Sequence, residues 1–513
     1  MKFNASDVYI YYRPSRCERR VYLANLELER APLSPYAEVL RKLGLRHERA
    51  HLESFSTVTD LSSFDLQERE RKTLEAIEKG EAVIYQGVLK AQMTVRDLTV
   101  DVIGQPDFLI RDGNTYKIRD SKISKRITEQ DHPEILLQMG IYGWLYQQAL
   151  GQLPSALEIH NGLGEIVGIS FDRKAAIRAI EGICLLRQAN VEPVSPVGWS
   201  KCNGCPFKDR CWSQAERESN VALIPDVDQS LAITLSELGA ASIPELLDKF
   251  NEESLADLER PWGSRKQRVG KRAESILRSA NALMSGETIL LQEPLIPELS
   301  NYAVFDLEGM PPHLDELEKI YLWGLQVFGE NLGEYMAATA GFGRDGDREG
   351  WFRFLDIAES IFEMHGDIPF LHWNHYEKGR VKLYIERYGD PKGVAGRVLK
   401  NLLDLLPITK NSVVLPLPSY SLKVIEEHAG FQRTQDEYGG DWAMAKYIEA
   451  TETNDEETRG GLMESILTYN REDLEATWCV FEWLRGKFKC ALKINPLVGG
   501  HEQESLVPSP TQA

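Results

Sequence analysis

The stretch GQPDFLIRDGNTYKIRDSK, residues 104–122, decides how the first part of this chain folds. It holds the end of one strand-like run, residues 98–110, and most of another, residues 115–123. We expect Asp107 to end the first strand. Asp120 and Lys122 share one face of the second, because side chains along a strand alternate with period two. The pattern therefore predicts that two carboxylates and an ammonium group converge.

The flanking sequence predicts an α/β domain around this stretch. Residues 37–55 and 134–150 read as helices, and residues 82–91 add a further strand-like run. The expected order is a helix, three strands with turns, and a long helix. We place this domain at residues 1–215.

Four cysteines form a second pattern in the same region. Cys17 stands alone, whereas Cys202, Cys205 and Cys211 follow the spacing C-x2-C-x5-C. Four thiolates suit either a zinc ion or an iron–sulfur cluster, and the spacing alone does not choose between them. Because the chain has no signal-peptide pattern, its seven cysteines favour metal binding or burial over disulfides.

In this order, the motifs resemble those of the RecB-like nucleases of the iron–sulfur type. Pro106-Asp107 matches the "PD" of the PD-(D/E)XK motif, and Asp120-Ser121-Lys122 matches its "(D/E)-x-K". The resemblance implies a restriction-endonuclease-like fold and catalysis with Mg²⁺ or Mn²⁺, which prefer carboxylate ligands. It also implies a [4Fe-4S] cluster on the four cysteines that joins the two ends of the domain, with zinc as the alternative occupant.

Three further positions match the same family. Gln138 and Tyr142 correspond to the Q-x3-Y that follows the catalytic strands, and they share a helix face. His47 corresponds to a metal-binding histidine on an early helix. Glu48 is the alternative, as the helix carboxylate of the wider superfamily. Packing and capping roles for Gln138 and Tyr142 remain open.

The same helix contains a competing motif. Residues 47–51 read His-Glu-Arg-Ala-His, the H-E-x-x-H of zinc metallopeptidases. Two histidines four residues apart could bind zinc, with Glu48 as the general base. The longer metzincin motif does not continue after His51. A zinc peptidase is therefore a third interpretation, behind the nuclease and an adaptor.

Strand-like patterns stop at residue 216, and residues 216–295 are expected to be all-helical. Residues 238–247 weakly resemble a helix–hairpin–helix unit, and Ser242 and Pro244 fit the start of an ordinary helix. A basic stripe in this region is a candidate phosphate contact, with a solvated helix face as the alternative. Its members are Arg265, Lys266, Arg268, Lys271 and Arg272.

Residues 296–490 carry a second acidic pattern. Asp306 and Glu308 form D-x-E on one face of a strand, and Tyr469 precedes Asp473 in Y-x3-D. This pattern resembles the DEDDy exonucleases and the YprB-type RNase H-like domain, in which four carboxylates hold two metal ions and the tyrosine orients the attacking water. The fourth carboxylate is open. Glu377 and Asp404 are the two candidates, and an inactive scaffold remains an alternative.

Bulk properties limit the remaining possibilities. The chain has 513 residues and a net charge of −19, which argues against a broadly basic nucleic-acid-coating protein but not against a nuclease with local phosphate contacts. It shows neither an apolar signal sequence nor a run long enough to span a membrane, so we expect a cytoplasmic protein. Residues 491–513 are expected to be a disordered tail.

We therefore predict a metal-dependent DNA nuclease, acting as an exonuclease on single strands or free ends in repair or defence. RNA remains an alternative substrate. Because the sequence contains no P-loop, a helicase would have to act in trans. The alternative function is a non-catalytic nucleic-acid-binding adaptor with decayed sites.

Overall fold

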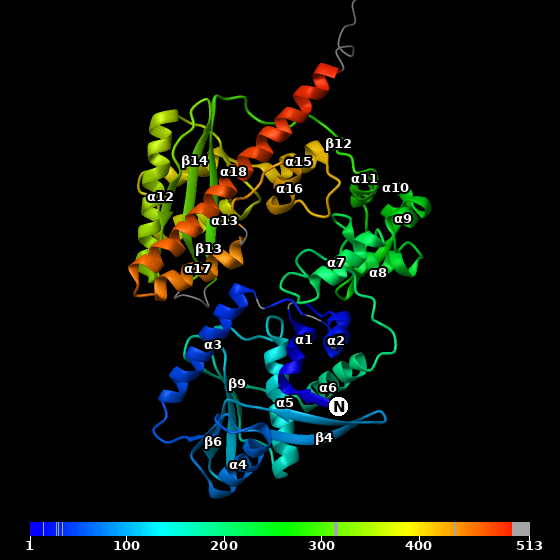
Figure 1. Cartoon of the computed structure of the whole chain (residues 1–513), viewed down its shortest axis with the longest axis vertical. Helices are drawn as coiled ribbons and strands as arrows, with labels where there is room; N and C mark the ends of the chain where they lie inside the picture. The colour runs from blue at the N-terminus through cyan, green and yellow to red at the C-terminus, as the bar shows by residue number, and fades with distance from the viewer. Residues whose placement is uncertain are drawn as a thin grey trace, which may run out of the picture.

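Two α/β domains are stacked along the long axis of the molecule, with a smaller group of helices beside them (Figure 1). The computed structural model describes residues 1–494 apart from residues 14, 27, 29, 33, 312–316 and 436–437, and describes only the backbone of residues 488–494. Of the expected disordered tail, residues 495–513 lie outside the described residues. The backbone of residues 491–494 continues the last helix.

A six-stranded sheet in the order β2-β3-β6-β7-β8-β9 forms the base of the N-terminal domain. Its strands are β2 (Thr59–Asp60), β3 (Val83–Tyr85), β6 (Phe108–Asp112), β7 (Thr115–Ser121), β8 (Leu157–His160) and β9 (Ile166–Ile169). β6 and β7 run antiparallel, whereas β7 and β8 run parallel. Alternate residues of β7 are buried: Tyr116, Ile118 and Asp120. The period of two thus carries one acid into the interior beside two core residues.

A second sheet, in the order β1-β5-β4, and six helices complete this domain. Their bounds are β1 (Lys2–Asn4), β4 (Leu89–Val95), β5 (Leu98–Gly104), α1 (Val8–Tyr12), α2 (Glu18–Asn25), α3 (Pro35–Glu53), α4 (Leu66–Lys79), α5 (Pro133–Leu150) and α6 (Arg173–Arg187), with a 3-10 turn at Ala5–Asp7. Helix α5 packs against α6 and against strands of both sheets. Because α5 is surrounded in this way, most of its side chains are buried, including Gln138 and Tyr142.

The expected strands of this domain are present but divided differently. Residues 82–91 split into β3 and β4, and residues 98–110 split into β5 and β6. The chain crosses from one sheet to the other at each break, where Gln86 has a positive φ of 55° and Pro106 has no N–H to donate. Asp107 therefore lies one residue before β6, rather than at the end of a strand as predicted.

The middle of the chain is mainly helical. Its helices are α7 (Lys208–Arg217), α8 (Gln229–Glu237), α9 (Ile243–Lys249), α10 (Glu252–Asp257) and α11 (Arg272–Ser285), with a 3-10 turn at Val221–Leu223. Ser242 caps α9 by accepting a 3.4 Å hydrogen bond from the backbone N–H of Glu245, and Pro244 lies in the first turn. This confirms the predicted helix start.

The expectation that this region is helical throughout is wrong at one place. A hairpin of β10 (Glu259–Trp262) and β11 (Arg265–Arg268) precedes α11. Gly263 adopts a positive φ of 59° in the turn of this hairpin. All four residues of β11 are exposed, so the sequence of this strand has no apolar periodicity that would indicate a helix. Arg260 anchors the hairpin through a buried guanidinium group 2.5 Å from Asp228. The pair β12 (Ile289–Leu290) and β18 (Val413–Val414) then ties the middle region to the C-terminal domain.

The C-terminal domain contains a five-stranded sheet in the order β15-β14-β13-β16-β17. Its strands are β13 (Asn301–Met310), β14 (Lys319–Gly329), β15 (Met336–Thr339), β16 (Phe370–His372) and β17 (Leu402–Asp404). β14 runs antiparallel to β13 and β15, while β16 runs parallel to β13 and β17. Nearly all residues of β13 and β14 are buried, which requires cover on both faces of the sheet.

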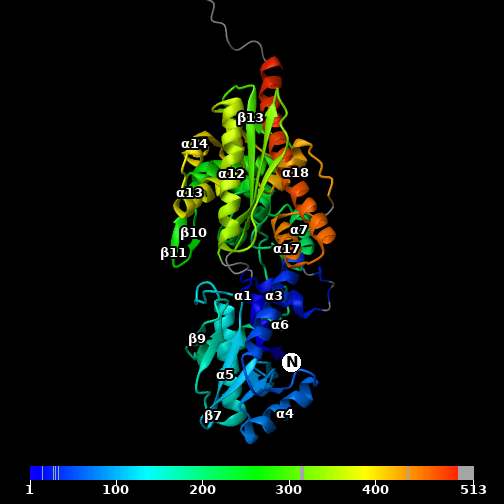
Figure 2. The same ribbon diagram turned by 90° about the vertical axis from the view of Figure 1, so that its left-hand side faces the viewer.

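Helices supply that cover (Figure 2). They are α12 (Gly343–His365), α13 (Tyr376–Tyr388), α14 (Val394–Asn401), α15 (Leu405–Ser412), α16 (Leu422–Ala429), α17 (Gly440–Glu452) and α18 (Glu456–Ile494). Phe305 and Leu307 of β13 pack in the cluster that includes α12, so the alternate residues of β13 face α17 and α18. Within the described ranges, no helix combines the length and apolarity needed to cross a bilayer.

Helix α3 connects the two domains, because it lies against α17 in both views (Figures 1 and 2). The guanidinium group of Arg46 pairs with both carboxylate oxygens of Glu452, at 2.7 and 3.0 Å. Val39 and Leu43 of α3 pack in the same apolar cluster as Tyr447. The helix that carries His47 and Glu48 is thus held against the C-terminal domain from Val39 to Arg46.

Candidate active sites

The first site is built where β6 begins and β7 ends. The backbone N–H of Asp107 donates a 3.0 Å hydrogen bond to Oδ1 of Asp120. In return, the backbone N–H of Ser121 donates a 2.7 Å hydrogen bond to Oδ2 of Asp107. Each carboxylate is therefore held by the backbone of the other residue's segment. Burial and the nearby charge of Asp120 raise the pKa of Asp107 well above its ordinary value.

Lys122 stands directly after β7 and completes this group. Its Nζ lies 2.8 Å from Oδ2 of Asp120, and its backbone N–H donates a 2.9 Å hydrogen bond to the carbonyl oxygen of His160. Burial alone would lower the pKa of Lys122, but Asp120, Tyr9 and Asp107 together outweigh this effect and raise the pKa above its ordinary value. The ammonium group is consequently charged at neutral pH.

Glu48 is joined to the two aspartates through Gln86. Nε2 of Gln86 lies 2.7 Å from Oε1 of Glu48 and 3.1 Å from Oδ1 of Asp107, and it donates to both. The Tyr85 hydroxyl also donates a 2.7 Å hydrogen bond to Oε1 of Glu48. Of the two candidates on α3, the structure thus links the carboxylate to the acidic group. Sequence reasoning missed Gln86, because this residue reaches the site only through tertiary packing.

His47 takes part in a stack of three imidazole rings instead. Its ring lies 4.3 Å from that of His160, and the ring of His51 lies 3.9 Å from the same ring, both nearly parallel to it. One face of an imidazole cannot hold two parallel rings at these distances, so His47 and His51 lie on opposite faces of His160. Among the described residues, neither histidine belongs to a group of three closely spaced metal-ligand atoms, so this geometry gives the H-E-x-x-H zinc interpretation no support. Burial lowers the pKa of His51 and of His160 to about 4.

Gln138 and Tyr142 belong to a hydrogen-bonded chain behind the acids. Nε2 of Gln138 donates to the Tyr142 hydroxyl at 2.9 Å, and that hydroxyl donates to the carbonyl oxygen of Gln105 at 3.0 Å. The Tyr9 hydroxyl donates to Oε1 of Gln138 at 3.2 Å, and the ring of Tyr9 lies 5.9 Å from Nζ of Lys122. Burial raises the pKa of both phenols, so they stay neutral. Tyr9 is a site residue that the sequence analysis did not single out.

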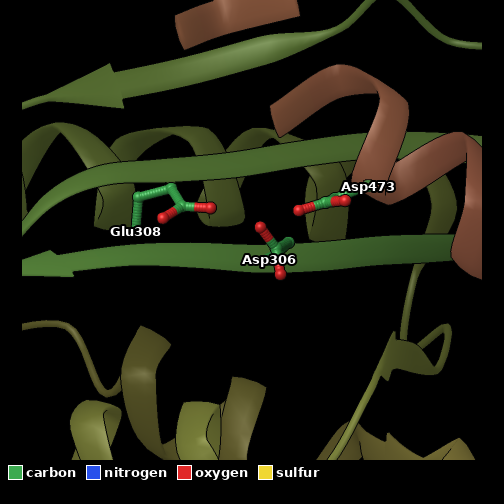
Figure 3. A group of neighbouring side chains, drawn as sticks. All are labelled: Asp306, Glu308 and Asp473. Carbon is green, nitrogen blue, oxygen red and sulfur yellow. The ribbon is translucent and has the colours of Figure 1, made fainter. Parts of the chain in front are cut away.

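A second acidic group lies in the C-terminal domain (Figure 3). Asp306 and Glu308 project from one face of β13, and Asp473 reaches them from α18. Oxygen atoms from all three lie within 4.8 Å of one another, which suits a hard divalent cation. Burial and the charge of Asp473 raise the pKa of Glu308 to about 8, and the same causes raise the pKa of Asp306 well above its ordinary value.

Polar side chains fix the two β13 acids. Nδ2 of Asn470 donates a 2.7 Å hydrogen bond to Oδ2 of Asp306, and the Tyr335 hydroxyl holds the Asn470 amide with a 2.8 Å hydrogen bond. The Tyr321 hydroxyl lies 3.5 Å from Oε2 of Glu308. These contacts fix the positions of the two carboxylates.

Two cations bind the third acid. The ammonium group of Lys423 and the guanidinium group of Arg433 both contact Oδ1 of Asp473. Tyr469 lies beneath them, with its ring 4.5 Å from Nζ of Lys423 and 5.6 Å from the guanidinium carbon of Arg433. Burial raises the pKa of Tyr469 well above its ordinary value. Neither cation was predicted, because a lysine and an arginine in a helix–loop segment give no catalytic signal in a sequence.

The two candidates for the fourth carboxylate are engaged elsewhere. Oε2 of Glu377 lies 3.0 Å from Nδ1 of His372, and both side chains are buried. Asp404 is the N-cap of α15, where it accepts hydrogen bonds from the backbone N–H groups of Asn374 at 2.9 Å and Leu406 at 3.1 Å. Neither carboxylate places an oxygen within 4.8 Å of all three acids, although the charge of Glu377 is near enough to contribute to the raised pKa of Asp306.

The comparisons with known proteins match both sites. Residues 12–212 match a model of the PD-(D/E)XK nuclease superfamily, and residues 303–485 match a model of the RNase H superfamily. The chain joins a PD-(D/E)XK nuclease domain to an RNase H domain. The two acidic groups lie one in each of these nuclease-type domains, which confirms the fold class and the family resemblance predicted from the sequence.

Other comparisons add little. No curated protein matches the chain. It is similar to a solved structure titled "Crystal structure of SSO0001", with 16% identity over 41% of this chain and 86% of that chain. The TM-score is 0.22, so this likeness carries no weight for fold or function.

The four cysteines lie together within the PD-(D/E)XK domain. Cys17 directly precedes α2, and Cys202, Cys205 and Cys211 lie in and after the loop before α7. Burial raises the pKa of Cys211 to about 11, and the other three thiols add to the rise. The fold therefore joins the first part of this domain to its end. Three cations, Arg19, Arg20 and Lys201, lie close enough to influence these thiols or be influenced by them.

The predicted basic stripe lies between the two nuclease domains in sequence. Arg265, Lys266 and Arg268 stand exposed on β11, and Lys271 and Arg272 form the start of α11. Arg268 pairs with Asp257 at 3.2 Å, and Arg272 lies 3.6 Å from Asp228. The stripe is thus a strand and a helix start, within a region that was expected to be all-helical.

Proposed function

We propose that this chain is a divalent-metal-dependent DNA nuclease, that it removes nucleotides from single strands or free ends, and that it works in repair or defence. The observation that carries the proposal is the geometry of Asp107, Asp120 and Lys122. Two acids are held within one hydrogen-bonded unit, and the lysine ammonium group lies 2.8 Å from one of them. Nuclease-type superfamily matches over both domains support the same conclusion.

In this proposal, Asp107, Asp120 and Glu48 hold a Mg²⁺ or Mn²⁺ ion. Such an ion lowers the pKa of a bound water and offsets charge on the phosphate. Lys122 stays protonated and stabilises the negative charge that grows on the phosphate as the P–O bond breaks. Gln86 keeps Glu48 and Asp107 together, and the chain from Tyr9 to Tyr142 holds the other wall of the site.

The cysteine cluster is proposed to hold a [4Fe-4S] cluster with a structural role. Cys17 lies far in the sequence from Cys202, Cys205 and Cys211, whereas the ligands of a structural zinc site usually come from short stretches of chain, which supports the cluster over zinc. Arg20 and Lys201 supply positive charge beside the thiolates.

Cleavage assays on protein purified without oxygen test the proposal. End-labelled single- and double-stranded DNA would be incubated with Mn²⁺ and the wild-type chain, Lys122→Ala or Asp306→Ala. We expect Lys122→Ala to lower the rate by about 10²- to 10³-fold, as for loss of one electrostatic contact to the transition state. If the wild-type chain binds DNA without cutting it, the adaptor function is supported instead. If Lys122→Ala cuts DNA as fast as the wild-type chain does, Lys122 has no role in the mechanism.

A further inference from the structure

The hairpin of β10 and β11 carries an exposed tryptophan next to its turn. Trp262 is the last residue of β10, and its side chain is 57% exposed. The hairpin lies at the edge of the molecule's outline in Figure 2. A single exposed aromatic side chain is common on protein surfaces and needs no explanation by itself. The residues around Trp262 therefore decide what it can bind.

A buried arginine holds the tryptophan ring in place. The guanidinium carbon of Arg260 lies 4.7 Å from the centroid of the Trp262 ring. Arg260 is 1% exposed, lies 2.5 Å from the carboxylate of Asp228, and donates a 3.1 Å hydrogen bond to Oε1 of Gln267. The same carboxylate of Asp228 caps α8. Because the support of the ring is buried and paired, little conformational freedom is lost when a ligand stacks on the ring.

Two cations stand beside the ring near the turn. Trp262 pairs with Arg265, and Pro261 pairs with Lys266. Residues directly opposite each other in an antiparallel pair lie on the same face, so Arg265 shares the face of Trp262. Lys266 is the next residue of β11 and lies on the other face. Both cations are exposed.

The sequence gathers positive charge at this hairpin, although the chain as a whole is acidic. Residues 265–272 contain five basic and no acidic side chains, in a chain with a net charge of −19. A polyanion approaches an acidic protein most easily where positive charge is concentrated locally. The end of the hairpin is such a place, and it also presents an aromatic ring.

An exposed indole with cations at its side fits an unpaired nucleotide. Every base has a flat π face that can stack on an aromatic ring, and the adjacent phosphates carry the negative charge that arginine and lysine bind. Inside a duplex, both faces of each base are covered by the neighbouring base pairs. Trp262 can therefore stack on an unpaired or terminal base, but not on a base in the interior of double-stranded DNA.

We propose that the β10–β11 hairpin binds an unpaired nucleotide of single-stranded DNA, with Trp262 stacked on the base and with Arg265 and Lys266 at the adjacent phosphates. This inference rests on the proposed function, because it names the form of DNA that the nuclease holds. The hairpin contributes to affinity and not to bond breaking. A strand bound there stays attached to the protein between cleavage events.

The decisive experiment compares single-stranded DNA with relaxed, closed circular duplex DNA, which has no ends. Filter binding with the full chain would be done without divalent metal ions, so that neither probe is cut. Trp262→Ala should weaken the binding of single-stranded DNA by about 5- to 100-fold, as for loss of one stacked base, and should leave binding of the circular duplex unchanged. Equal affinity of Trp262→Ala and the wild-type chain for single-stranded DNA would contradict the inference, and so would equal weakening on both probes.

Two further substitutions separate stacking from the support of Arg260. Trp262→Leu keeps an apolar side chain beside the guanidinium group but has no ring, so it should unfold at the wild-type temperature and bind single-stranded DNA as weakly as Trp262→Ala. Trp262→Phe keeps a ring and should retain most of the affinity, while the quenching of tryptophan fluorescence by single-stranded DNA should decrease. Wild-type affinity in Trp262→Leu would show that the ring does not stack on a base.

Arg265→Ala tests the phosphate contact. It should reduce the slope of log affinity against log salt by about 0.7 for single-stranded DNA, whereas Trp262→Ala should leave this slope unchanged. An unchanged slope in Arg265→Ala would contradict the contact. Phe64→Ala is the matched control, since Phe64 is 39% exposed and its ring centroid lies 4.4 Å from Nζ of Lys72. Phe64 precedes the acid-rich helix α4, so its removal should leave DNA affinity unchanged.

The binding readout separates this inference from the proposed function. If the chain cuts DNA but Trp262→Ala binds single-stranded DNA as tightly as the wild-type chain does, the proposed function stands and the inference fails. If the chain binds single-stranded DNA through Trp262 but cuts no DNA, the inference stands and the nuclease function fails. A wild-type chain that does not bind single-stranded DNA would overturn the inference.

Discussion

Nζ of Lys122 lies 2.8 Å from Oδ2 of Asp120, although no regular strand geometry holds the lysine, which follows the last residue of β7. The pair is anchored by backbone hydrogen bonds on both sides, from Asp107 to Asp120 and from Lys122 to His160. A charged lysine is thereby presented to a group of acids whose mutual repulsion it relieves. This relationship is the basis of the predicted chemistry of the first site.

Substitutions at Lys122 should separate its charge from its shape. Lys122→Met removes the charge and keeps the chain length, so we expect cleavage to fall about 10²- to 10³-fold. Lys122→Arg keeps the charge but changes the geometry, and it should retain partial activity. Initial rates on end-labelled DNA measure both. Equal loss in the two variants would show that charge is not what the lysine supplies.

Glu48 and His47 make opposite predictions for metal binding. Glu48→Gln should weaken Mn²⁺ binding at the first site by at least tenfold, because it removes a carboxylate joined to Asp107 through Gln86. His47→Asn should leave that affinity almost unchanged, since the His47 ring stacks on His160. Calorimetric titration of chains with Asp306→Asn isolates the first site. A larger effect from His47→Asn would reverse the assignment.

The second site should respond to pH through Glu308. Its pKa is raised to about 8, so without an ion the folded protein favours the protonated form. Stability from this group is complete below its unfolded pKa of about 4.3 and is lost as pH rises towards 8. Mn²⁺ requires the ionised form, so its affinity for this site should rise between pH 6.5 and 8.5. Thermal unfolding with and without Mn²⁺ measures both trends.

Glu308→Gln is the control for this pH dependence. The variant should be more stable than the wild-type chain at pH 8 without Mn²⁺, and it should lose most of the stabilisation that Mn²⁺ provides. A Mn²⁺ affinity that does not change with pH in the wild-type chain would show that Glu308 is not a ligand.

Cys17 should be essential to the cluster despite its distance in sequence. Cys17→Ser should abolish the visible absorption and the bound iron of protein purified without oxygen, because it removes one of four ligands. Unfolding should also occur at lower temperature, since the cluster links the first part of the domain to its end. Cys184→Ser is the control, because Cys184 lies buried in the apolar core. If the purified protein contains zinc and no iron, the four cysteines hold zinc and the iron–sulfur proposal is wrong.

The basic stripe should contribute to DNA affinity in proportion to its free charges. Lys266 stands exposed on β11, so Lys266→Ala should weaken binding and reduce the slope of log affinity against log salt by about 1. Arg268 already pairs with Asp257 and Glu259, and Arg268→Ala should have a smaller effect. Fluorescence anisotropy at several salt concentrations distinguishes the two. If the wild-type chain and both variants give the same slope, β11 does not contact the DNA.

Much of the fold could be predicted from short motifs and periodicity. The period of two predicted that Asp120 and Lys122 lie on one face, and the capping residue Ser242 marked the start of α9. The division of the chain between two sheets could not be predicted, because the run around Gln86 is continuously apolar on both sides of the break. The β10–β11 hairpin was missed for a related reason, as its second strand buries no residue.

The sites show the same division between local and long-range signals. Asp107, Asp120 and Lys122 lie close in sequence and could be grouped from spacing alone. Tyr9, Gln86 and Lys423 reach their sites only through tertiary packing, and no local pattern identifies them. The choice between His47 and Glu48 likewise depends on which way α3 is turned, which packing against α17 and β7 decides.

The most direct test of the central claim is cleavage by a chain whose RNase H site has been silenced. A chain with Asp306→Asn and Asp473→Asn leaves only the PD-(D/E)XK site able to act. The account predicts Mn²⁺-dependent release of nucleotides from end-labelled single-stranded DNA by this chain, and its loss on adding Asp120→Asn. No cleavage before that addition, or equal cleavage after it, would contradict the account.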